Sequence, residues 1–431
     1  KPLSSFIHQF ILNKRDFIKA LGVMTLSTPF LSYKGFDQSA DIDYSQRKRL
    51  SEENFWKSIR KDYLLKKDYV NLENGYYCFI PQPTLNKYLE HVKRINFEGS
   101  YYMRNQLDLD KRKTAERLSN LVNCDKDELA ITRNTTESLD LIISGFPWKK
   151  NDEAIFAIQD YGSMQEMFKL TAKRRGIVNK IISVPNQPEN DEEIVSLYEQ
   201  QITKKTKLIM VSHMINITGQ ILPVKKICEM AHSYNVDVLV DGAHCVGHID
   251  VDIKDLNCDY YGSSLHKWLS APLGTGLLFV KKEKISKIEP ILAGHVHQRD
   301  NIMRLNHIGT HPVHSDLAIN DAIDYLESIG IERKQNRLRY IQRYWSDKLR
   351  FKNNIIINTP TEIQRSCGIA NIGVKNKTPD ELSKILFNEY SIFTVAIDYA
   401  NVKGCRITPN IYTNEEELDY FVESIIKIAS N

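Results

Sequence analysis

The stretch that decides the fold is residues 236–280, VDVLVDGAHCVGHIDVDIKDLNCDYYGSSLHKWLSAPLGTGLLFV. Three runs in it, VDVLVDGA, DYYGSS and GTGLLFV, are rich in aliphatic and β-branched residues and predict buried strands. Polar residues follow two of these runs directly: Asp241 ends the first, and Ser264, His266 and Lys267 end or follow the second. Most lysines are solvated surface residues, so the role of Lys267 depends on what the rest of the chain brings to it.

The same pattern continues upstream. ELAITRN, EAIFAI and KLIMVSHM also predict buried strands, and helical patterns such as TESLDLIISGF and PVKKICEMAHSYN lie between the strands. Strand and helix alternate over residues 128–280, which favours a mostly parallel sheet covered by helices on both faces. Ligands of such sheets bind at the carboxyl ends of the strands, so Asp241 and Lys267 lie where a site is expected.

After residue 311 the pattern changes. A long helical pattern broken near Gly330 precedes the short strand-like runs CGIANIGV, FTVAI and GCRITPNIY, which alternate with amphipathic helical stretches. Residues 43–123 are turn-rich in part and harder to place. We expect a signal-like or tail segment over 1–36, an N-terminal arm over 37–75, a large domain over 76–310, and a linking helix with a small domain over 311–431.

Length and composition are those of an ordinary globular protein. The 431 residues suffice for two or three structural parts with sizeable cores. The 58 basic and 54 acidic residues leave a net charge of only +4, which gives no electrostatic reason to expect a nucleic-acid partner. No apolar run reaches the ~20 residues of a membrane-spanning helix. The seven cysteines are scattered without metal-ligand spacing, so we expect free thiols.

The N-terminal stretch NKRDFIKALGVMTLSTPFLSYKG, residues 13–35, allows two interpretations. It resembles a twin-arginine export signal, with Lys14 and Arg15 where that pattern prefers two arginines. The alternative is an amphipathic N-terminal helix on a cytoplasmic protein. The localisation therefore stays open between the periplasm and the cytoplasm.

Three features of the strand ends suit one cofactor. TRNTTESL places Thr135 and Thr136 where a strand gives way to a helix, and the N–H groups and hydroxyls of a helix N-terminus bind phosphate well. Asp241 follows an apolar strand, where a carboxylate is costly without a cation. Pyridoxal phosphate needs a phosphate cradle, a carboxylate for its ring nitrogen and a lysine such as Lys267 for its aldehyde. Taken singly, these residues also suit a helix cap, an ion pair and a surface lysine.

The order and spacing of the motifs lead to a family. DGAH, followed by DYYGSSLHK and then GTG, resembles the cofactor site of the class V aminotransferases, which have fold type I and include cysteine desulfurases and isopenicillin N epimerase. Leu265 departs from the pattern, since the family usually has a small residue there. TRNTTES, QDYGSM and RITPNIY are most similar to the isopenicillin N epimerase-like branch. The resemblance implies a large, mostly parallel α/β/α sheet domain and a smaller C-terminal α+β domain.

The resemblance also implies roles for single residues around the cofactor ring. Lys267 would form the Schiff base with pyridoxal 5'-phosphate, Asp241 would pair with the ring nitrogen, and His244 would reach the ring oxygen. Asn216 would lie beside that oxygen or the substrate carboxylate. Tyr161 would stack on the ring, where cysteine desulfurases have a histidine.

Further residues are implied at the phosphate and at the substrate. Thr135, Thr136, Ser264 and His266 would bind the phosphate, and Gly309 and Thr310 match a loop that reaches the phosphate of a neighbouring subunit, which implies a homodimer with a shared site. Arg406 would clamp a substrate α-carboxylate, because a planar guanidinium suits bidentate binding. The other substrate candidates are Asn74, Tyr76 and Arg104. The histidines at 295, 297, 307 and 311 lack metal-ligand spacing, so no metal is expected.

These parts predict an enzyme that acts at the α-carbon of an amino acid or a similar substrate, by epimerase- or aminotransferase-type chemistry. A C–S β-lyase is the alternative. A cysteine desulfurase needs a cysteine on a mobile loop of the small domain, and the corresponding stretch TVAIDYANVKG has none. A non-catalytic protein of this fold is expected to have lost Lys267, Asp241 or Arg406, and all three are present.

Overall fold

The computed structural model describes residue 47 and residues 49–294 and 298–430. The chain separates into two units, Lys1–Asp43 and Tyr44–Asn431. The signal-like segment over 1–36 lies outside the described residues, and so do His295 and His297. All the helices and strands described belong to the second unit.

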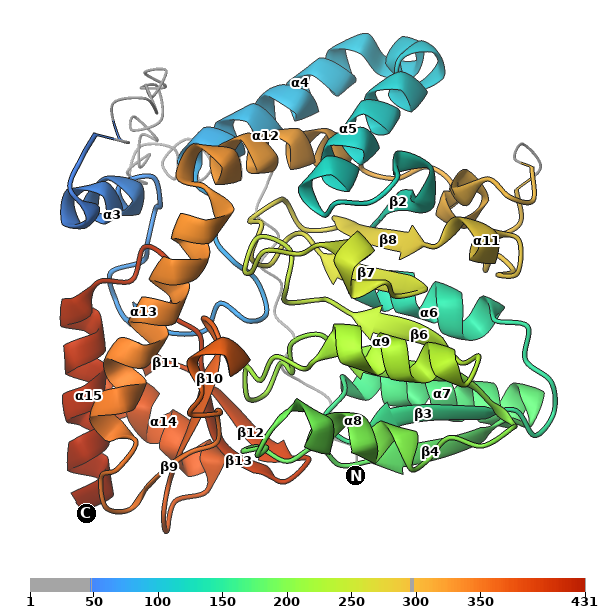
Figure 1. Ribbon diagram of the computed structural model, residues 1–431. Coiled ribbons are helices and arrows are strands. Elements are labelled where there is room, and N and C mark those ends of the chain that lie inside the picture. Colours follow the sequence, from blue (N-terminus) through green and yellow to red (C-terminus); the bar gives the residue numbers. More distant parts are fainter. Residues whose placement is uncertain (1–46, 48, 295–297, 431) are drawn as a thin grey trace, which may run out of the picture. The chain divides into compact units, whose positions relative to one another are not determined.

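A seven-stranded sheet forms the centre of the larger part of this unit (Figure 1). Its strands are β2 (Leu129–Thr132), β3 (Glu153–Ala157), β4 (Val178–Ile182), β5 (Thr206–Ser212), β6 (Asp237–Asp241), β7 (Tyr260–Ser264) and β8 (Gly276–Val280). The spatial order is β2-β8-β7-β6-β5-β3-β4, and only β8 runs antiparallel to its two neighbours. The carboxyl ends of β5, β6 and β7 therefore meet at one edge, with Ser212 beside Asp241 and Asp241 beside Gly262.

Each face of the sheet has its own core, because side chains alternate between the faces along every strand. Phe156, Met210 and Leu239 pack in one cluster, with helices α6 (Thr135–Gly145) and α7 (Gly162–Arg175). Their neighbours Ile209 and Val240 belong to the larger cluster on the other face, which includes α9 (Val224–Ser233). The helix α8 (Asp191–Glu199) packs beside α9 (Figure 1). A sheet buried on both faces explains why the strands read as nearly continuous apolar runs.

A second, smaller sheet follows in the chain. Its strands are β9 (Ile355–Ile357), β10 (Ala370–Val374), β12 (Val395–Tyr399) and β13 (Val402–Ile407), in the antiparallel order β12-β13-β10-β9. The helices of this part are α13 (Ile331–Leu349), α14 (Pro379–Tyr390) and α15 (Glu415–Ser430). The helix α12 (Val313–Ile329) precedes α13 and ends at Gly330, whose φ of 90° lies outside the helical range.

The segment before the large sheet joins both parts. After α3 (Glu52–Arg60), strand β1 (Val70–Asn71) pairs in parallel with β11 (Ile392–Phe393), and Glu73 forms a bridge with Thr408. The chain then enters α4 (Gln82–Asn105), which is kinked at Gly99, and α5 (Leu107–Leu121). Residues 70–75 are thus held against the small sheet, more than 300 residues later in the chain.

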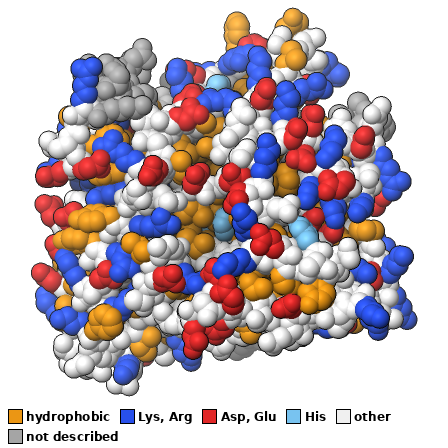
Figure 2. Space-filling model, viewed as in Figure 1, with side chains coloured by type: hydrophobic (Ala, Val, Ile, Leu, Met, Phe, Trp, Pro, Cys, Tyr) orange, Lys and Arg blue, Asp and Glu red, His pale blue; other side chains and the backbone are white. Residues whose placement is uncertain are grey.

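The structure confirms the predicted fold class, the strand and helix alternation over residues 128–280 and the helix break near Gly330. The four-part division at residues 36, 75 and 310 remains a prediction. All seven cysteines are free, as expected, and all are buried. Among the described residues no helix is long and apolar enough to cross a membrane. Basic and acidic side chains are interspersed over the face that Figure 2 shows.

Candidate active site

A cavity of about 320 Å³ opens at the carboxyl ends of the large sheet's central strands. It is lined by Gly75, Tyr76, Arg133, Asn134, Thr135, Thr136, Leu139, Tyr161, Met164, Ser212, Met214, Asn216, Asp241, Ala243, His244, Ser264, His266, Lys267, Leu273, Gly274 and Arg406. Most of the residues predicted from the sequence are therefore brought together. Five of the lining residues are exposed and lie at the mouth: Arg133, Gly274, and Tyr76, Tyr161 and Leu273, the last three at 78%, 46% and 59%.

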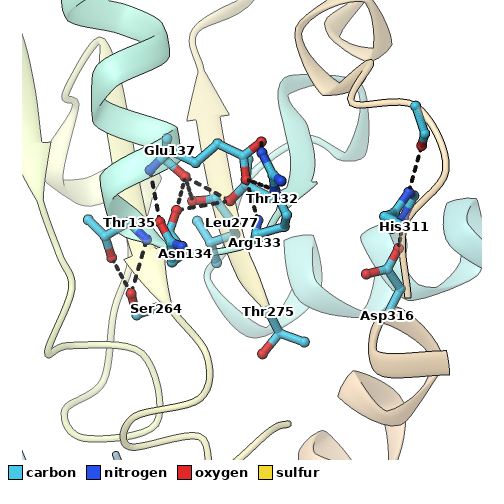
Figure 3. A network of polar contacts seen from close by, with 12 residues as sticks. Thr132, Arg133, Asn134, Thr135, Glu137, Ser264, Thr275, Leu277, His311 and Asp316 are labelled. Carbon is cyan, nitrogen blue, oxygen red and sulfur yellow. Dashed lines mark hydrogen bonds and ion pairs between the residues drawn. The ribbon is translucent and has the colours of Figure 1, made fainter. Parts of the chain in front are cut away.

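One end of the cavity is the N-terminus of α6. Thr135 is the first residue of this helix, and both its N–H and its hydroxyl are hydrogen-bonded to Ser264 Oγ, at 3.0 and 2.7 Å (Figure 3). The preceding residue, Asn134, caps the helix by accepting from Glu137 N. Gly276, which starts β8, passes so close that a Cβ there would lie 2.8 Å from the Asn134 backbone. The glycine therefore lets the helix start sit directly on the strand end, with hydroxyls and a positive dipole end facing the cavity.

The other end holds a buried carboxylate. Asp241 is 6% exposed, and its Oδ1 accepts a hydrogen bond from Ala243 N at 3.0 Å. No other described group is hydrogen-bonded to this carboxylate. Burial raises the pKa of Asp241, because the charged form has lost water. A cation placed against it would restore the ionised form.

Lys267 extends into the cavity between these two ends. Its Nζ lies 3.0 Å from His244 Nε2, and the other ring nitrogen of His244 accepts from Trp268 Nε1 at 3.2 Å. Burial lowers the pKa of Lys267 to about 8, against the favourable field of Asp241. Burial also lowers the pKa of His244 far below its usual value and that of His266 to about 4. Near neutral pH both histidines are uncharged, and about a tenth of Lys267 is the nucleophilic free amine, far more than for an unperturbed lysine.

The wall opposite is built by the small sheet. Arg406, on β13, is only 7% exposed, and its Nη2 and Nε donate to the two carboxylate oxygens of Glu73 at 2.5 and 3.2 Å. Its Nη1 donates to the Asn216 carbonyl at 3.2 Å. Gly75 lies under the guanidinium, since a Cβ there would be 2.6 Å from Arg406 Cζ. The guanidinium is thus fixed from three sides and lines the cavity with the rest.

Four of the predicted site residues lie elsewhere. Asn74 does not line the cavity; its amide donates to the Thr408 carbonyl and its oxygen accepts from Tyr412, so it fastens the N-terminal segment to the small sheet. Arg104 is exposed in the last turn of α4. Gly309 and Thr310 lie outside this chain's own cavity, and their role toward a second subunit stays a prediction.

Of the four candidate histidines, only His307 and His311 are among the described residues. His311 pairs with Asp316 at 3.0 Å (Figure 3). Within the described part of the chain, no group of three or more His, Cys, Asp or Glu residues could hold a metal.

Three residues that matter to the geometry were not predicted. Glu73 pairs with Arg406, Trp268 is bonded to His244, and His248 stacks on Trp268 with ring centroids 3.8 Å apart. Glu73 could have been suspected, since a carboxylate beside a turn-forming Asn-Gly pair is a possible partner for a buried arginine. The tryptophan and His248 carry no comparable signal in the sequence.

Comparison with known proteins gives the family and supports the fold. The family model described as Aminotransferase class-V matches residues 81–421. The isopenicillin N epimerase of Streptomyces clavuligerus is 25% identical over 387 residues, which cover 86% of this chain and 97% of that protein. The apo structure of a cysteine desulfurase from Thermococcus onnurineus NA1 superposes with a TM-score of 0.77 at 21% identity, covering 87% of this chain and 98% of that one. A mutant of C-DES with glycine covalently linked to its PLP cofactor has a TM-score of 0.76 at 19% identity, covering 83% and 96%.

The residues present fit pyridoxal 5'-phosphate. The hydroxyls of Thr135 and Ser264 stand at a helix N-terminus, where a phosphate would replace their mutual bond. Asp241 is a buried carboxylate with a single N–H partner, which suits a protonated ring nitrogen. Lys267 supplies the amine. With a family match over most of its length and this donor set, the chain belongs to the class V aminotransferase family and is an enzyme whose cofactor is pyridoxal 5'-phosphate.

Proposed function

We propose that this enzyme acts at the α-carbon of an amino acid or an amino-acid-like substrate, by epimerase- or aminotransferase-type chemistry, with Lys267 as the covalent attachment point and proton carrier. The observation that supports this most is that Lys267 and Arg406 line the same cavity from opposite domains. A substrate carboxylate on the guanidinium would leave the substrate amine and Cα directed toward the lysine end.

The cofactor, when bound, supplies an aldehyde that captures the substrate amine and a cationic ring that withdraws electrons from a breaking bond at Cα. Asp241 would hold the proton on the ring nitrogen, because a carboxylate in this buried position is stabilised by an adjacent cation. Thr135, Ser264 and the start of α6 would bind the phosphate. Lys267 Nζ would take the proton from Cα and return it, with a pKa near 8 suited to both steps.

Two observations speak against desulfuration to a persulfide. None of the seven cysteines lines the cavity, and all are buried. In addition, β12 and β13 pair up to Tyr399 and Val402, so that only Ala400 and Asn401 connect them, both with positive φ. Asn401 at this turn donates to Ser183 of the large domain at 3.3 Å. Such a tight, docked turn offers neither a thiol nor a long loop to carry one.

Incubation of the enzyme with a panel of L- and D-amino acids in deuterated water distinguishes the reactions. Deuterium at Cα with inversion identifies an epimerase, a keto acid identifies an aminotransferase, and pyruvate with a released thiol identifies a β-lyase. The proposal requires one of the first two. Borohydride reduction followed by peptide mapping should place the cofactor on Lys267, and Lys267→Ala should abolish both labelling and exchange. Release of pyruvate and thiol as the main products would refute the proposal.

We further propose a homodimer in which Gly309 and Thr310 of one chain contact the phosphate bound to the other. The support is that both residues lie outside their own chain's cavity, and that Phe97 and Tyr101 of α4 are 91% and 68% exposed. Light scattering should give twice the chain mass. Co-expressed Lys267→Ala and Thr310→Ala chains should form a mixed dimer with one intact site, and a monomer in solution would contradict the arrangement.

A further inference from the structure

The residue after the catalytic lysine candidate is a tryptophan that is entirely buried. Its single polar side-chain atom, Nε1, donates to His244 Nδ1 at 3.2 Å. The opposite nitrogen of the same ring, His244 Nε2, lies 3.0 Å from Lys267 Nζ. The Trp268 indole therefore reaches the reacting amine through His244, and the hydrogen positions along this chain of three groups can be worked out.

The indole nitrogen is a donor and never an acceptor, so His244 Nδ1 must present its lone pair to Trp268. His244 is 2% exposed, and burial among cations lowers its pKa well below the usual value, so the ring is neutral. A neutral imidazole carries one proton, which must then sit on Nε2. That N–H points at Lys267 Nζ, which can accept it only with a lone pair. An ammonium group has none.

We propose that Trp268 is a positioning residue that fixes His244 as the Nε2–H tautomer and thereby favours the free, nucleophilic amine form of Lys267 over its ammonium form. The inference rests on the proposed role of Lys267, and it adds the device that prepares this residue for the cofactor. The same Nε2–H donor also suits the ring oxygen of the bound cofactor, which accepts hydrogen bonds.

Trp268 is itself held so that its indole cannot turn away. Its ring stacks on His248 with centroids 3.8 Å apart at 28°. His248 accepts from Gly368 N at 2.7 Å and so donates from Nδ1 to the His244 carbonyl at 2.9 Å. The buried Lys334 of α13 donates to the Trp268 carbonyl. A Cβ on Gly368 would lie 3.1 Å from the Trp268 ring, so the small domain packs directly on the indole.

The other titratable and charged groups around Lys267 shift its protonation state in opposite directions. Asp241 and Glu73 favour the ammonium form, whereas Arg406 disfavours it, and neither the Cys78 thiol, whose pKa burial raises to about 12, nor His266 is charged near neutral pH. The cost of burying the ammonium form outweighs these charges and lowers the pKa of Lys267 to about 8. Without the Trp268 donor, His244 could carry its proton on Nδ1 and accept from an ammonium at Nε2. The pKa of Lys267 would then rise.

The test is Trp268→Phe in the full-length chain freed of cofactor, with Trp345→Phe as the matched control. Trp345 is equally buried, but its Nε1 has no hydrogen-bond partner, so that substitution removes similar volume and no bond. Competitive acetylation with acetic anhydride, resolved by peptide mass spectrometry over a range of pH, titrates each lysine separately. We expect the Lys267 curve of Trp268→Phe to shift upward by about one pKa unit, which is about a tenfold loss of labelling near pH 7. Trp345→Phe should match the wild type.

An unshifted Lys267 curve in Trp268→Phe would overturn the proposal. Should that variant fail to fold, ¹⁵N spectra of histidine-labelled wild-type protein answer the question directly, with His244→Gln used to assign the signals. They must show the protonated nitrogen of His244 to be Nε2, and a proton on Nδ1 refutes the inference. Both measurements use protein without cofactor or substrate, so they succeed or fail independently of which reaction the enzyme catalyses.

Discussion

Glu73 is the group whose removal tests the substrate end of the site most sharply. It neutralises Arg406 inside the protein, where the two side chains are only 4% and 8% exposed, and it occupies the Nε and Nη2 donors. Asn216 takes one donor of Nη1. A substrate carboxylate must therefore use the remaining N–H groups and lie near the Glu73 carboxylate. Glu73→Gln keeps the shape and removes the charge.

The size of the expected effect of Glu73→Gln on carboxylate binding follows from this geometry. Carboxylates on two edges of one guanidinium are about 5–6 Å apart, and at an effective dielectric constant of about 20 they repel by about 3 kcal/mol. Relief of that repulsion corresponds to about a hundredfold tighter binding of a carboxylate. Because removal of one partner of a buried ion pair costs about 3–5 kcal/mol of stability, the variant should also unfold at lower urea concentration.

The assay compares two small reagents that both react with the enzyme-bound cofactor, aminooxyacetate with a carboxylate and methoxyamine without one. The visible absorbance of the cofactor reports binding, and the ratio of the two half-saturating concentrations isolates the carboxylate. We expect this ratio to change by about ten- to a hundredfold in favour of aminooxyacetate in Glu73→Gln. Glu417→Gln is the control, since it breaks the Arg60–Glu417 pair, which does not line the cavity. An unchanged ratio in Glu73→Gln would show that Arg406 does not receive the substrate carboxylate.

Three further outcomes are expected. Ser264→Ala removes the hydroxyl bonded to Thr135 and should weaken cofactor binding by about 1–1.5 kcal/mol, or about tenfold, in a cofactor titration followed by tryptophan fluorescence; equal affinity would contradict the phosphate assignment. Gly276→Ala places a Cβ 2.8 Å from the Asn134 backbone and should lower both the melting temperature and cofactor affinity, so an unchanged affinity would contradict the role of this close approach in placing the start of α6. Burial lowers the pKa of His213 to about 4, so the unfolded chain, which titrates near 6.5, takes up more protons as the pH falls. The free energy of unfolding should therefore drop by about 2 kcal/mol for this residue between about pH 7 and about pH 5, and urea titrations of wild type and His213→Gln should diverge over that range.

The sequence was sufficient to predict the central strands of the large sheet, but not its edge strand β4 or the helix α4. β5, β6 and β8 are buried on both faces and are predicted from their continuous apolar runs. β4 is an edge strand with exposed Val178 and Ile181 and the polar residues Asn179 and Lys180, so its pattern is indistinct. In α4 the bend at Gly99 and the outward-facing Phe97 remove the amphipathic period that would identify the helix.

The same distinction holds at the site. Asp241, Ser264 and Lys267 are predicted because each directly ends or follows a strand whose carboxyl end points to the site. The pairing of Glu73 with Arg406 depends on how β1 meets β11 across more than 300 residues, and no local pattern reports such a contact. The family resemblance predicts a substrate contact for Asn74, yet its neighbours Thr408 and Tyr412 satisfy its amide within the fold.

The attachment of residues 70–75 to the last sheet has a consequence for how the protein is made. Before β13 is synthesised, Lys267 and Asp241 are already part of the chain. Arg406 is still missing, so Glu73 and Gly75 lack the residues that they contact in the folded protein. A nascent chain can therefore form the central sheet without closing its catalytic centre. The wall that Glu73, Gly75 and Arg406 build beside Lys267 can therefore form only once β13 has been synthesised.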